Sequence, residues 1–483
     1  MVRTRYAPSP TGYMHIGNIR AALNEYLLAR SLKGTFVLRI EDTDQKREVE
    51  GAVQLVYDTL ASVGIDHDEG PDVGGPYGPY IQSQRKNNYM EYAKELIEKK
   101  KAYYCFCSKE RLETLTKEGT ADAVKYDRHC LSLSREEIAE KLEHNEPFVI
   151  RQLIPEGKTT FKDELYGEIT VDNSELDDQI LIKSDGFPTY NFANVIDDNS
   201  MKITHVIRGS EYLSSTPKYN LLYEAFGWDI PVYIHVATIL GENGQKLGKR
   251  TGAVPVLKLI EDGYLPEALL NFTALLGWSP SSNQEIFTKE ELIEAFDVKG
   301  LSKSPSICDM TKLAWMNGEY FKKMDFNKFY EMSEPVIKEA LGSALSQNHK
   351  KIAAMVQTRI SFIKEIPEMI GFFKELPSYS LNLYENKKQK TDAASSLASL
   401  EKTVPLLEGT EPLSWNNDFL YNALQQLAKD NGLKNSQILW PVRTALSGRQ
   451  TTPCGATELL EIFGKEESLV RIKTGIEMIK KAN

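Results

Sequence analysis

The chain has 483 residues, of which 41% are hydrophobic and 26% are charged, and its formal net charge at pH 7 is −10. This length exceeds what one hydrophobic core supports, so we expect about two to four domains of an ordinary soluble protein. An apolar run of about 18 residues and a signal-peptide pattern are both absent, which argues against a membrane protein. The acidic balance argues against non-specific nucleic-acid binding but allows a local basic groove. Five cysteines are too few for a disulfide scaffold, so we expect a protein of the reducing cytoplasm.

The first forty residues predict a strand, a helix and a second strand. Residues 2–7 alternate basic and apolar side chains and end at Pro8. A helix follows from Asn18, its expected N-cap, to Gly34, because apolar residues recur at helical spacing, namely Ile19, Ala22, Leu23, Tyr26 and Leu27. Residues 35–40 form the next strand. This succession predicts a βαβ unit and hence a parallel sheet.

The next part of the chain predicts an interruption of that sheet. A helix over residues 49–63 is followed by a turn-rich break at 70–79 and by a helix at 86–101. Irregular chain and short strands come after it, which indicates an insertion. We expect the sheet to resume at three short apolar runs, near residues 179–183, 203–207 and 233–239.

The tail differs from the rest of the chain. Helical periodicity dominates beyond residue 325, and a polar break at 385–392 divides the tail into two parts. The sequence therefore predicts an α/β multi-domain protein: a Rossmann-type parallel-sheet domain with an insertion, and an all-α C-terminal region. We expect the first half of the sheet domain at residues 1–80, the insertion at 81–185 and the second half of the sheet domain at 186–252. A further region follows at 253–324, and the helical tail occupies 325–483.

His15 lies in a loop of prolines and glycines that leads directly into a helix, Arg5-Tyr-Ala-Pro-Ser-Pro-Thr-Gly12-Tyr-Met-His15-Ile-Gly17-Asn18. A histidine in a loop is most often a surface or capping residue. Here the N-terminus of the helix offers free N–H groups and partial positive charge to a phosphate. The imidazole and Asn18 can donate hydrogen bonds to phosphate oxygens as charge builds up in a transition state.

A basic stretch, Lys246-Leu-Gly-Lys249-Arg250, lies halfway along the chain. On its own it is typical of a solvated basic turn. Its glycine-containing flanks indicate a loop that can close, and paired lysines neutralise a departing pyrophosphate without a general acid. Together with the His15 loop, it predicts a nucleotide-activating site assembled from two distant segments.

These two segments resemble the signature motifs of class I aminoacyl-tRNA synthetases, and further motifs resemble the bacterial type of glutamyl-tRNA synthetase. The matching segments are Arg5 to Gly12, Arg39-Ile-Glu-Asp-Thr-Asp44, Asp185-Gly-Phe-Pro-Thr-Tyr190-Asn-Phe-Ala-Asn194 and Val206-Ile-Arg208-Gly-Ser-Glu211. The resemblance covers essentially the whole chain. It departs at Asn18, where the first signature ends in histidine, and at Gly248, where the second has serine. Gly248 lacks that hydroxyl, so we expect a looser loop.

The resemblance implies that L-glutamate is activated with ATP, accompanied by Mg²⁺, and transferred to tRNA(Glu), with tRNA(Gln) left open. It implies catalytic roles for His15, Lys246 and Lys249. The implied ATP site comprises Pro8, Ser9, Gly17, Asn18, Lys246, Lys249 and Arg250. The implied glutamate site comprises Arg5, Ala7, Ser9, Glu41, Tyr190, Asn194 and Arg208. Guanidinium groups bind carboxylates in a bidentate manner and reject an amide, although an arginine taken singly more often serves in a structural ion pair.

The resemblance also assigns tasks to the other regions. The insertion would hold the acceptor end of the tRNA, residues 253–324 would contact its stem, and the helical tail would bind its anticodon. In the tail, Trp440 and nearby arginines fit either a core tryptophan with surface charges or a surface that stacks and contacts bases. The candidate tRNA-binding residues are Arg359, Arg443 and Arg449. We expect a monomer, because the tRNA surface uses every domain.

Three of the five cysteines fall within one short span, as Cys105-Phe-Cys107 and Cys130. Their spacing fits a zinc site or buried free thiols. Some members of the family bind zinc through a Cys-x-Cys pair, a tyrosine and a later cysteine, which implies a structural site of Cys105, Cys107, Tyr126 and Cys130. His129 is the alternative fourth ligand, while Cys308 and Cys454 stand alone.

Three other functions compete with the glutamate–tRNA ligase hypothesis. A shortened paralogue that attaches glutamate to a modified tRNA base lacks an anticodon-binding tail. A small-molecule adenylate-forming ligase leaves both the insertion and the tail without a task. A non-catalytic RNA-binding descendant is expected to have lost some of His15, Lys246 and Lys249, and all three are present.

Overall fold

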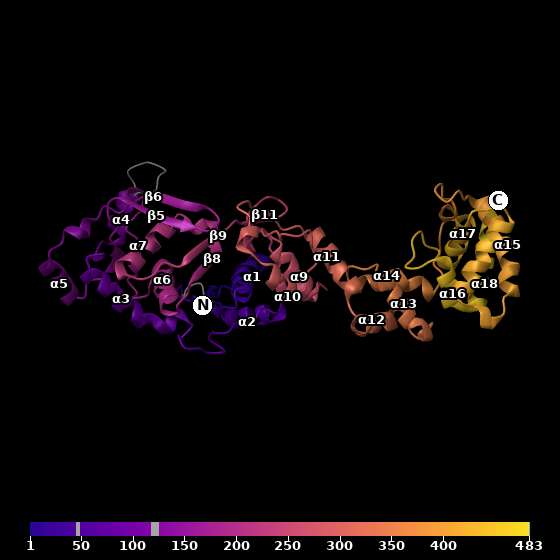
Figure 1. The fold of residues 1–483 in the computed structure, drawn as a ribbon, viewed down its shortest axis with the longest axis horizontal. Coiled ribbons are helices and arrows are strands. Elements are labelled where there is room, and N and C mark those ends of the chain that lie inside the picture. The colour runs from indigo at the N-terminus through magenta and orange to yellow at the C-terminus, as the bar shows by residue number, and fades with distance from the viewer. Residues whose placement is uncertain (45–48, 117–124, 483) are drawn as a thin grey trace. The chain divides into compact units, whose positions relative to one another are not determined.

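The computed structural model describes residues 1–44, 49–116 and 125–482, and the chain forms two compact units (Figure 1). The first unit comprises Met1–Leu313 and the second Ala314–Asn483. In the described part of the chain, each helix is too short or too polar to cross a membrane.

The first unit contains all the strands of the described chain: β1 (Arg3–Tyr6), β2 (Thr35–Leu38), β3 (Ala102–Cys105), β4 (Val149–Gln152), β5 (Lys158–Asp163), β6 (Gly167–Asp172), β7 (Ile180–Ile182), β8 (His205–Gly209), β9 (Val232–Val236), β10 (Ile239–Leu240) and β11 (Ser306–Ile307). Its helices are α1 (Ile16–Ser31), α2 (Ala52–Ser62), α3 (Lys86–Glu98), α4 (Lys109–Thr116), α5 (Arg135–Glu143), α6 (Tyr190–Ser200), α7 (Thr216–Phe226), α8 (Val256–Glu261), α9 (Pro266–Ala274) and α10 (Lys289–Ala295). Helix α11 (Met310–Lys323) begins in this unit and continues into the second.

The predicted βαβ unit is confirmed. Strands β1 and β2 are parallel, in a register that pairs Arg3 with Thr35 and Tyr6 with Leu38. Strands β8 and β9 are parallel as well, and the backbone N–H of Thr204 donates to the carbonyl of Arg3 at 2.9 Å, which joins β1 to the chain just before β8. Parallel strands share the edge at which they end, so β1, β2 and β8 bring their following loops together.

Two segments of the expected insertion pair differently from the prediction. Strand β7 does not rejoin the parallel sheet: it pairs antiparallel with β4, which in turn pairs antiparallel with β3. Strand β5 pairs antiparallel with β6, and Asp163 at the end of β5 pairs in parallel with Tyr233 of β9, so this hairpin extends the β8–β9 sheet (Figure 1). Short apolar strands look alike in sequence, and only tertiary pairing decides which sheet they join.

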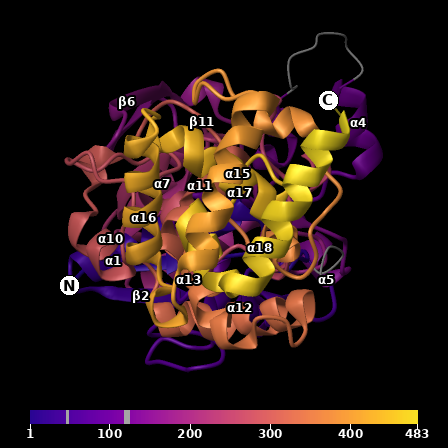
Figure 2. The same cartoon turned by 90° about the vertical axis from the view of Figure 1, so that its right-hand side faces the viewer.

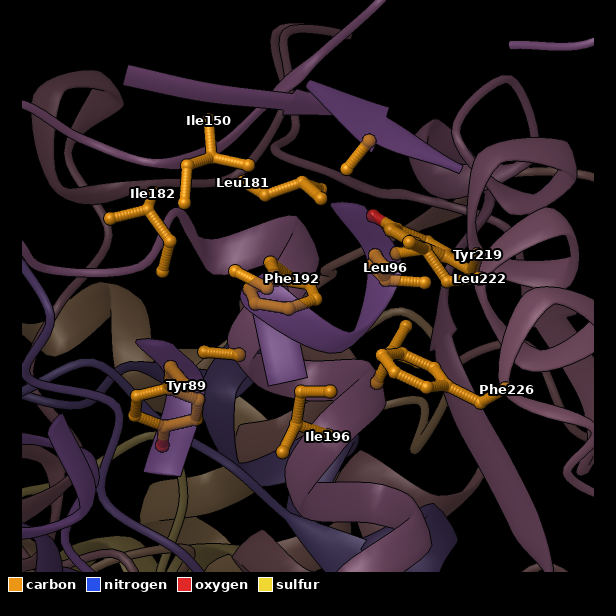
Figure 3. Packing of buried hydrophobic residues seen from close by; sticks show 14 of the residues in the cluster. Tyr89, Leu96, Ile150, Leu181, Ile182, Phe192, Ile196, Tyr219, Leu222 and Phe226 are labelled. Atoms are coloured by element: carbon orange, nitrogen blue, oxygen red, sulfur yellow. The ribbon is translucent and has the colours of Figure 1, made fainter. Parts of the chain in front are cut away.

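A buried hydrophobic cluster fixes α6 against the sheet of β3, β4 and β7. Phe192 and Ile196 of α6 pack with residues of α3, α7, β4 and β7, including Tyr89, Leu222, Ile150 and Leu181 (Figure 3). Each fully buried side chain of this size contributes about 1.5–3 kcal/mol to stability relative to an exposed one. The cluster therefore holds α6 in place, and with it Tyr190, the first residue of this helix.

The second unit is built from helices, as predicted for the tail. They are α12 (Phe326–Leu341), α13 (His349–Gln357), α14 (Ile366–Ile370), α15 (Ala393–Gly409), α16 (Asn417–Asp430), α17 (Asn435–Ser447) and α18 (Ala456–Ala482). Helices α12, α13 and α14 pack on one another, and α15 to α18 form a second group that lies side by side in both views (Figures 1 and 2). Helix α18 bends at Gly464, whose φ of 75° is left-handed, a conformation that glycine adopts without strain.

Candidate active site

A cavity of about 360 Å³ opens where β1 and β8 end. The His15 loop, α1, α6 and the Lys246 loop contribute to its walls. The predicted residues that line it are Arg5, Ala7, Pro8, Ser9, His15, Gly17, Asn18, Glu41, Tyr190, Arg208 and Lys246. Three predicted residues, Asn194, Lys249 and Arg250, are not among its lining residues. Asn194 is buried in α6, where its side-chain amide donates to the carbonyl of Tyr190 at 2.9 Å.

His15, and not Asn18, is the N-cap of α1. The Nδ1 atom of His15 accepts a hydrogen bond from the backbone N–H of Gly17 at 3.0 Å, and Asn18 Oδ1 accepts one from the backbone N–H of His15 at 3.0 Å. The prediction failed because an imidazole nitrogen serves as the cap acceptor, and Asn18 completes a capping box as its third residue. A Cβ on residue 17 would lie 2.8 Å from the His15 ring, so glycine permits this arrangement.

The capping hydrogen bond determines which ring nitrogen of His15 can donate to a ligand in the cavity. Burial, with a contribution from the Lys249 ammonium, lowers the pKa of His15, which favours the neutral ring. Because Nδ1 is an acceptor, the neutral ring carries its proton on Nε2. This Nε2 atom has no hydrogen-bond partner in the described part of the chain. His15 can therefore donate one hydrogen bond to a ligand in the cavity.

A buried network of five charged side chains forms the wall beside β1 and β2. The Arg5 guanidinium donates through Nε to Asp198 at 3.1 Å and through Nη1 to Glu25 at 2.9 Å. Arg39 donates through Nη1 to Asp198 at 2.7 Å and through Nη2 to Glu41 at 2.9 Å. All five residues are at most 5% exposed. Asp198, near the C-terminal end of α6, thus binds Arg5 of β1 and Arg39, the residue that follows β2.

The network changes the acidity of its carboxyl groups. Burial raises the pKa of Glu25 to about 8, with Arg5 opposing the shift, and raises the pKa of Glu41 to about 7, with Arg39 opposing it. Burial would also raise the pKa of Asp198, but its two guanidinium partners outweigh burial and keep that pKa below its usual value. Arg5 Nη2 has no partner among the residues described and is not fully enclosed, so it is free to meet a ligand.

Arg208, on β8, also lines the cavity but differs from Arg5. Its guanidinium is buried, and no carboxylate of the described chain lies within ion-pair distance. Three tyrosine rings surround it, with centroids at 5.4 Å for Tyr212, 4.5 Å for Tyr219 and 5.2 Å for Tyr233. A buried cation without an anionic partner is costly, and an anionic ligand in the cavity would remove that cost.

The Lys246 loop has its two lysines in different environments. Lys246 lines the cavity and forms an ion pair with Glu211 at 2.8 Å, in which both side chains are about half exposed to solvent. Lys249 donates through Nζ to the carbonyl of Thr11 at 2.6 Å, which ties this loop to the His15 loop. Arg250 is exposed and has no partner in the described ranges. Sequence reasoning assigned no site role to Glu25, which stands in no motif, or to Glu211, although Glu211 ends the matching segment at residues 206–211.

The three clustered cysteines converge in space. The thiol sulfurs of Cys105, Cys107 and Cys130 lie within 4.8 Å of one another. The Tyr126 hydroxyl lies 3.3 Å from the sulfurs of both Cys105 and Cys107. His129 does not contribute an atom to this group. Three thiols and a phenol oxygen within reach of one point fit a tetrahedral zinc ion, so the donor set is suited to that metal.

The comparisons with known proteins agree with this geometry. A family described as "tRNA synthetases class I (E and Q), catalytic domain" matches residues 1–315, and one described as "Anticodon binding domain" matches residues 328–476. The glutamate–tRNA ligase of Clostridium novyi (strain NT) is 57% identical over 484 residues, covering 100% of this chain and 99% of that protein. The chain belongs to the glutamate–tRNA ligase family of class I tRNA synthetases. It is therefore an enzyme of the ligase class.

Further relatives of the glutamate–tRNA ligase family extend the match. The glutamate–tRNA ligase of Clostridium tetani (strain Massachusetts / E88) is 54% identical over 482 residues, covering 99% of this chain and 98% of that protein. The crystal structure of a glutamate tRNA ligase from Elizabethkingia meningosepticum CCUG26117 in complex with its amino acid has a TM-score of 0.86 at 34% identity, and 99% of each chain is covered.

In the region that matches the anticodon-binding domain, two predicted arginines border one cavity. Arg359 and Arg449 line a cavity of about 520 Å³, together with Glu365, Glu368, Met369 and residues 450–453. Arg443 lies behind this segment: it packs on the Trp440 ring, with its guanidinium carbon 4.3 Å from the ring centroid, and donates to the carbonyl of Gln450 at 2.7 Å. Trp440 itself donates through Nε1 to the carbonyl of Leu383 at 2.9 Å. Arg443 thus supports the cavity wall rather than lining it.

The first prediction concerns Asp198. We expect Asp198→Asn to lower the free energy of unfolding by about 3–5 kcal/mol, because two buried guanidinium groups lose their shared negative partner. Urea unfolding followed by circular dichroism measures the effect. Asp229→Asn is the matched control, since Asp229 is exposed, and it should stay within about 0.5 kcal/mol of the unaltered protein. An equal effect of the two substitutions would contradict the assigned role of Asp198.

Proposed function

We propose that this chain activates L-glutamate with ATP and transfers the glutamyl group to the 3′ end of tRNA(Glu). The observation that carries the proposal is the buried Arg208 guanidinium, which borders the cavity and has no carboxylate partner among the described residues. Arg5, which lines the same cavity, keeps Nη2 available, and Glu41 supplies a carboxylate. Two cationic positions and one anionic position match the two carboxylates and one ammonium of glutamate.

The glutamate site would use Arg5, Ala7, Ser9, Glu41, Tyr190, Asn194 and Arg208. Arg208 would bind the side-chain carboxylate, since an uncompensated guanidinium gains most from a full negative charge. A glutamine amide would bring N–H donors against guanidinium donors, which rejects it. Glu41 would bind the α-ammonium, and Asn194 would act through its hydrogen bond to the carbonyl of Tyr190.

The ATP site would use Pro8, Ser9, Gly17, Asn18, Lys246, Lys249 and Arg250, with His15, Lys246 and Lys249 as catalytic residues. An oxygen of the α-carboxylate attacks the α-phosphorus, the bond to the β-phosphate oxygen breaks, and pyrophosphate leaves. His15 would donate from Nε2 to the phosphate, and Lys246 would exchange Glu211 for the leaving group. Mg²⁺ bound with ATP would supply further positive charge to the phosphates.

In the second step, a ribose hydroxyl at the tRNA 3′ end attacks the glutamyl carbonyl, and AMP leaves. Successive regions of the chain would contact successive parts of the tRNA. Residues 81–185 would bind its acceptor end, residues 253–324 its stem, and residues 325–483 its anticodon. Arg359, Arg443 and Arg449 would serve the anticodon, where a cavity with two arginines at its border offers contacts to unstacked bases. We propose a cytoplasmic monomer that acts in this way.

The cysteine cluster would hold a structural zinc ion through Cys105, Cys107, Cys130 and Tyr126. The donor geometry supports Tyr126 over His129 as the fourth ligand. Phe106 donates its backbone N–H to the Cys130 sulfur at 3.3 Å, and such a bond stabilises a thiolate ligand. Zinc would add stability to a region whose own core is small.

The decisive test is charging of purified tRNA(Glu) and tRNA(Gln) with labelled glutamate and ATP. Charging of tRNA(Glu) alone supports a ligase that discriminates between the two tRNAs. Charging of both supports a ligase that accepts either. Activation of glutamate with charging of neither would contradict the proposal and favour the chemistry of the base-modifying paralogue.

A second prediction follows from Glu41. A carboxylate binds an ammonium only when it is ionised, and burial raises the pKa of Glu41 to about 7. We therefore expect the KM for glutamate to be constant above pH 7 and to rise about tenfold per pH unit below it. In Glu41→Gln the KM for glutamate should be raised already at pH 8, and it should no longer rise as the pH falls below 7. Charging rates at saturating ATP and tRNA measure both effects.

The matched control for this prediction is Glu168→Gln, at an exposed position on β6. It should keep the KM and the pH profile of the unaltered enzyme. If Glu41→Gln kept the same rise of KM below pH 7, another group would be responsible and the role of Glu41 would be refuted.

A third prediction concerns the metal. We expect about one zinc ion per chain in the purified protein and little zinc in Cys107→Ser, since a structural site needs its full set of four ligands. Elemental mass spectrometry after dialysis measures the content. Cys308→Ser is the control, because Cys308 is also buried but lies outside the cluster. Tyr126→Phe should lose zinc more readily than His129→Ala, and the reverse order would make His129 the ligand. Full zinc in Cys107→Ser would refute the site.

A further inference from the structure

A line of three polar groups leads from β5 through β9 to Arg208. Asp163 Oδ2 lies 2.7 Å from His235 Nδ1, and His235 Nε2 lies 3.1 Å from Arg208 Nε. His235 and Arg208 are paired positions on the adjacent strands β9 and β8. Asp163 and His235 are fully buried, so water does not compete for these hydrogen bonds.

The protonation of this line follows from its donors. Asp163 also accepts from the backbone N–H groups of His235 at 3.0 Å, Leu165 at 2.9 Å and Tyr166 at 2.8 Å. Burial acts against ionisation of Asp163, but the hydrogen bonds led by that from His235 keep its pKa low. A carboxylate with four donors is an acceptor, so His235 Nδ1 carries a proton. Burial lowers the pKa of His235, so Nε2 stays unprotonated and accepts from Arg208.

The imidazole fixes the orientation of the Arg208 guanidinium. Nε donates to His235, and Nη2 donates to the Thr216 hydroxyl at 2.9 Å, which itself donates to the carbonyl of Tyr212 at 2.9 Å. Nη1 has no partner within the described ranges and is not fully enclosed. A planar group that is held at two of its nitrogens has one orientation left, which directs the third nitrogen to a ligand.

We propose that His235, held by Asp163, is a positioning residue that aligns Arg208 with the side-chain carboxylate of the substrate and thereby sets the preference for glutamate over glutamine. This inference rests on the glutamate site proposed above. A neutral acceptor is required at Nε2, since an imidazolium would turn an N–H towards a guanidinium and displace it. The neighbouring charged groups that face this line are Asp163, Arg208 and, more distantly, Glu211.

Two substitutions at His235 separate positioning from a merely structural role. The amide atoms of Gln stand at the position of Nε2 along the side chain, and those of Asn at the position of Nδ1. His235→Gln can therefore keep an acceptor for Arg208 while losing the donor to Asp163. His235→Asn can keep the donor to Asp163 while losing the acceptor for Arg208. A positioning role predicts that Gln is the better replacement, and a structural link between β5 and β9 predicts that Asn is.

The experiment compares charging of tRNA(Glu) by the unaltered enzyme, His235→Gln and His235→Asn. We expect His235→Asn to raise the KM for glutamate about 10–100-fold, the usual loss for a hydrogen bond to a charged group, with kcat and the KM for ATP changed less than about threefold. His235→Gln should recover most of this loss. Inhibition by glutamine, measured in the same assay, should increase in His235→Asn. Circular dichroism confirms that both variants are folded.

The outcomes are distinct. If His235→Asn keeps the KM for glutamate, or if His235→Gln is impaired at least as much, the positioning role is refuted. A nitrogen NMR spectrum with selectively labelled histidine adds a second check, since a protonated Nε2 on His235 in the resting enzyme would refute it as well. If the unaltered enzyme does not use glutamate at all, the proposed function fails, and this result differs from a failure of the inference.

Discussion

The carboxylate of Asp198 holds the first two strands and α6 in one arrangement, and the walls of the cavity depend on it. It accepts from Arg5 of β1 at 3.1 Å and from Arg39, the residue that follows β2, at 2.7 Å. Its own position is set by α6, whose other face is packed into the cluster around Phe192. Because buried charges are costly unless they are paired, this network tolerates few other arrangements. Hydrophobic packing thus fixes a carboxylate, and the carboxylate fixes two arginines.

The two arginines of the proposed glutamate site are therefore not equivalent. Arg5 is bound by two carboxylates and presents one remaining nitrogen, so its position is rigid but its charge is largely compensated. Arg208 is bound by neutral groups, an imidazole and a hydroxyl, so its orientation is fixed while its charge is not compensated by the described chain. An anionic side chain gains more from the second kind of partner. This difference supports the proposal that Arg208 makes the selective contact with the substrate and Arg5 a less selective one.

The sequence predicted the parts of the site that stand in motifs and missed those that depend on tertiary pairing. The His15 loop and the Lys246 loop could be found because their glycines, prolines and charges form recognisable local patterns. His235 stands in an ordinary strand, Val232–Val236, and its partner Asp163 lies 72 positions earlier. The pairing of Asp163 with Tyr233 brings them together, and this pairing has no local signature. The N-cap of α1 was predicted at the wrong residue for a related reason. Whether the His15 ring accepts the capping hydrogen bond depends on its orientation in the folded chain, which the sequence does not show.

The same tertiary pairing changes how the insertion is understood. Its strands β3, β4 and β7 form their own sheet, while its hairpin β5–β6 extends the sheet of β8 and β9. A division by residue number alone therefore assigns Asp163 to the insertion, although it accepts hydrogen bonds from His235 of β9.

Gly248, in the Lys246 loop, has a backbone conformation that does not require glycine. Its φ of −172° is extended backbone, and a Cβ there would meet only the Thr251 hydroxyl at 3.9 Å, so serine would fit.

Thr251, three residues after Gly248, supplies the hydroxyl that a serine at position 248 would bring to this loop. The Thr251 hydroxyl lies 2.7 Å from the carbonyl of Lys246 and 3.0 Å from that of Gly248, and it closes the turn that carries both lysines. The expected loosening by glycine is therefore countered by a hydrogen bond within the loop. Lys249 adds a contact to the carbonyl of Thr11, which fixes the far end of the turn against the His15 loop. Binding of a polyphosphate by Lys246, as proposed, would replace its exposed ion pair with Glu211, and exposed pairs of this kind contribute little.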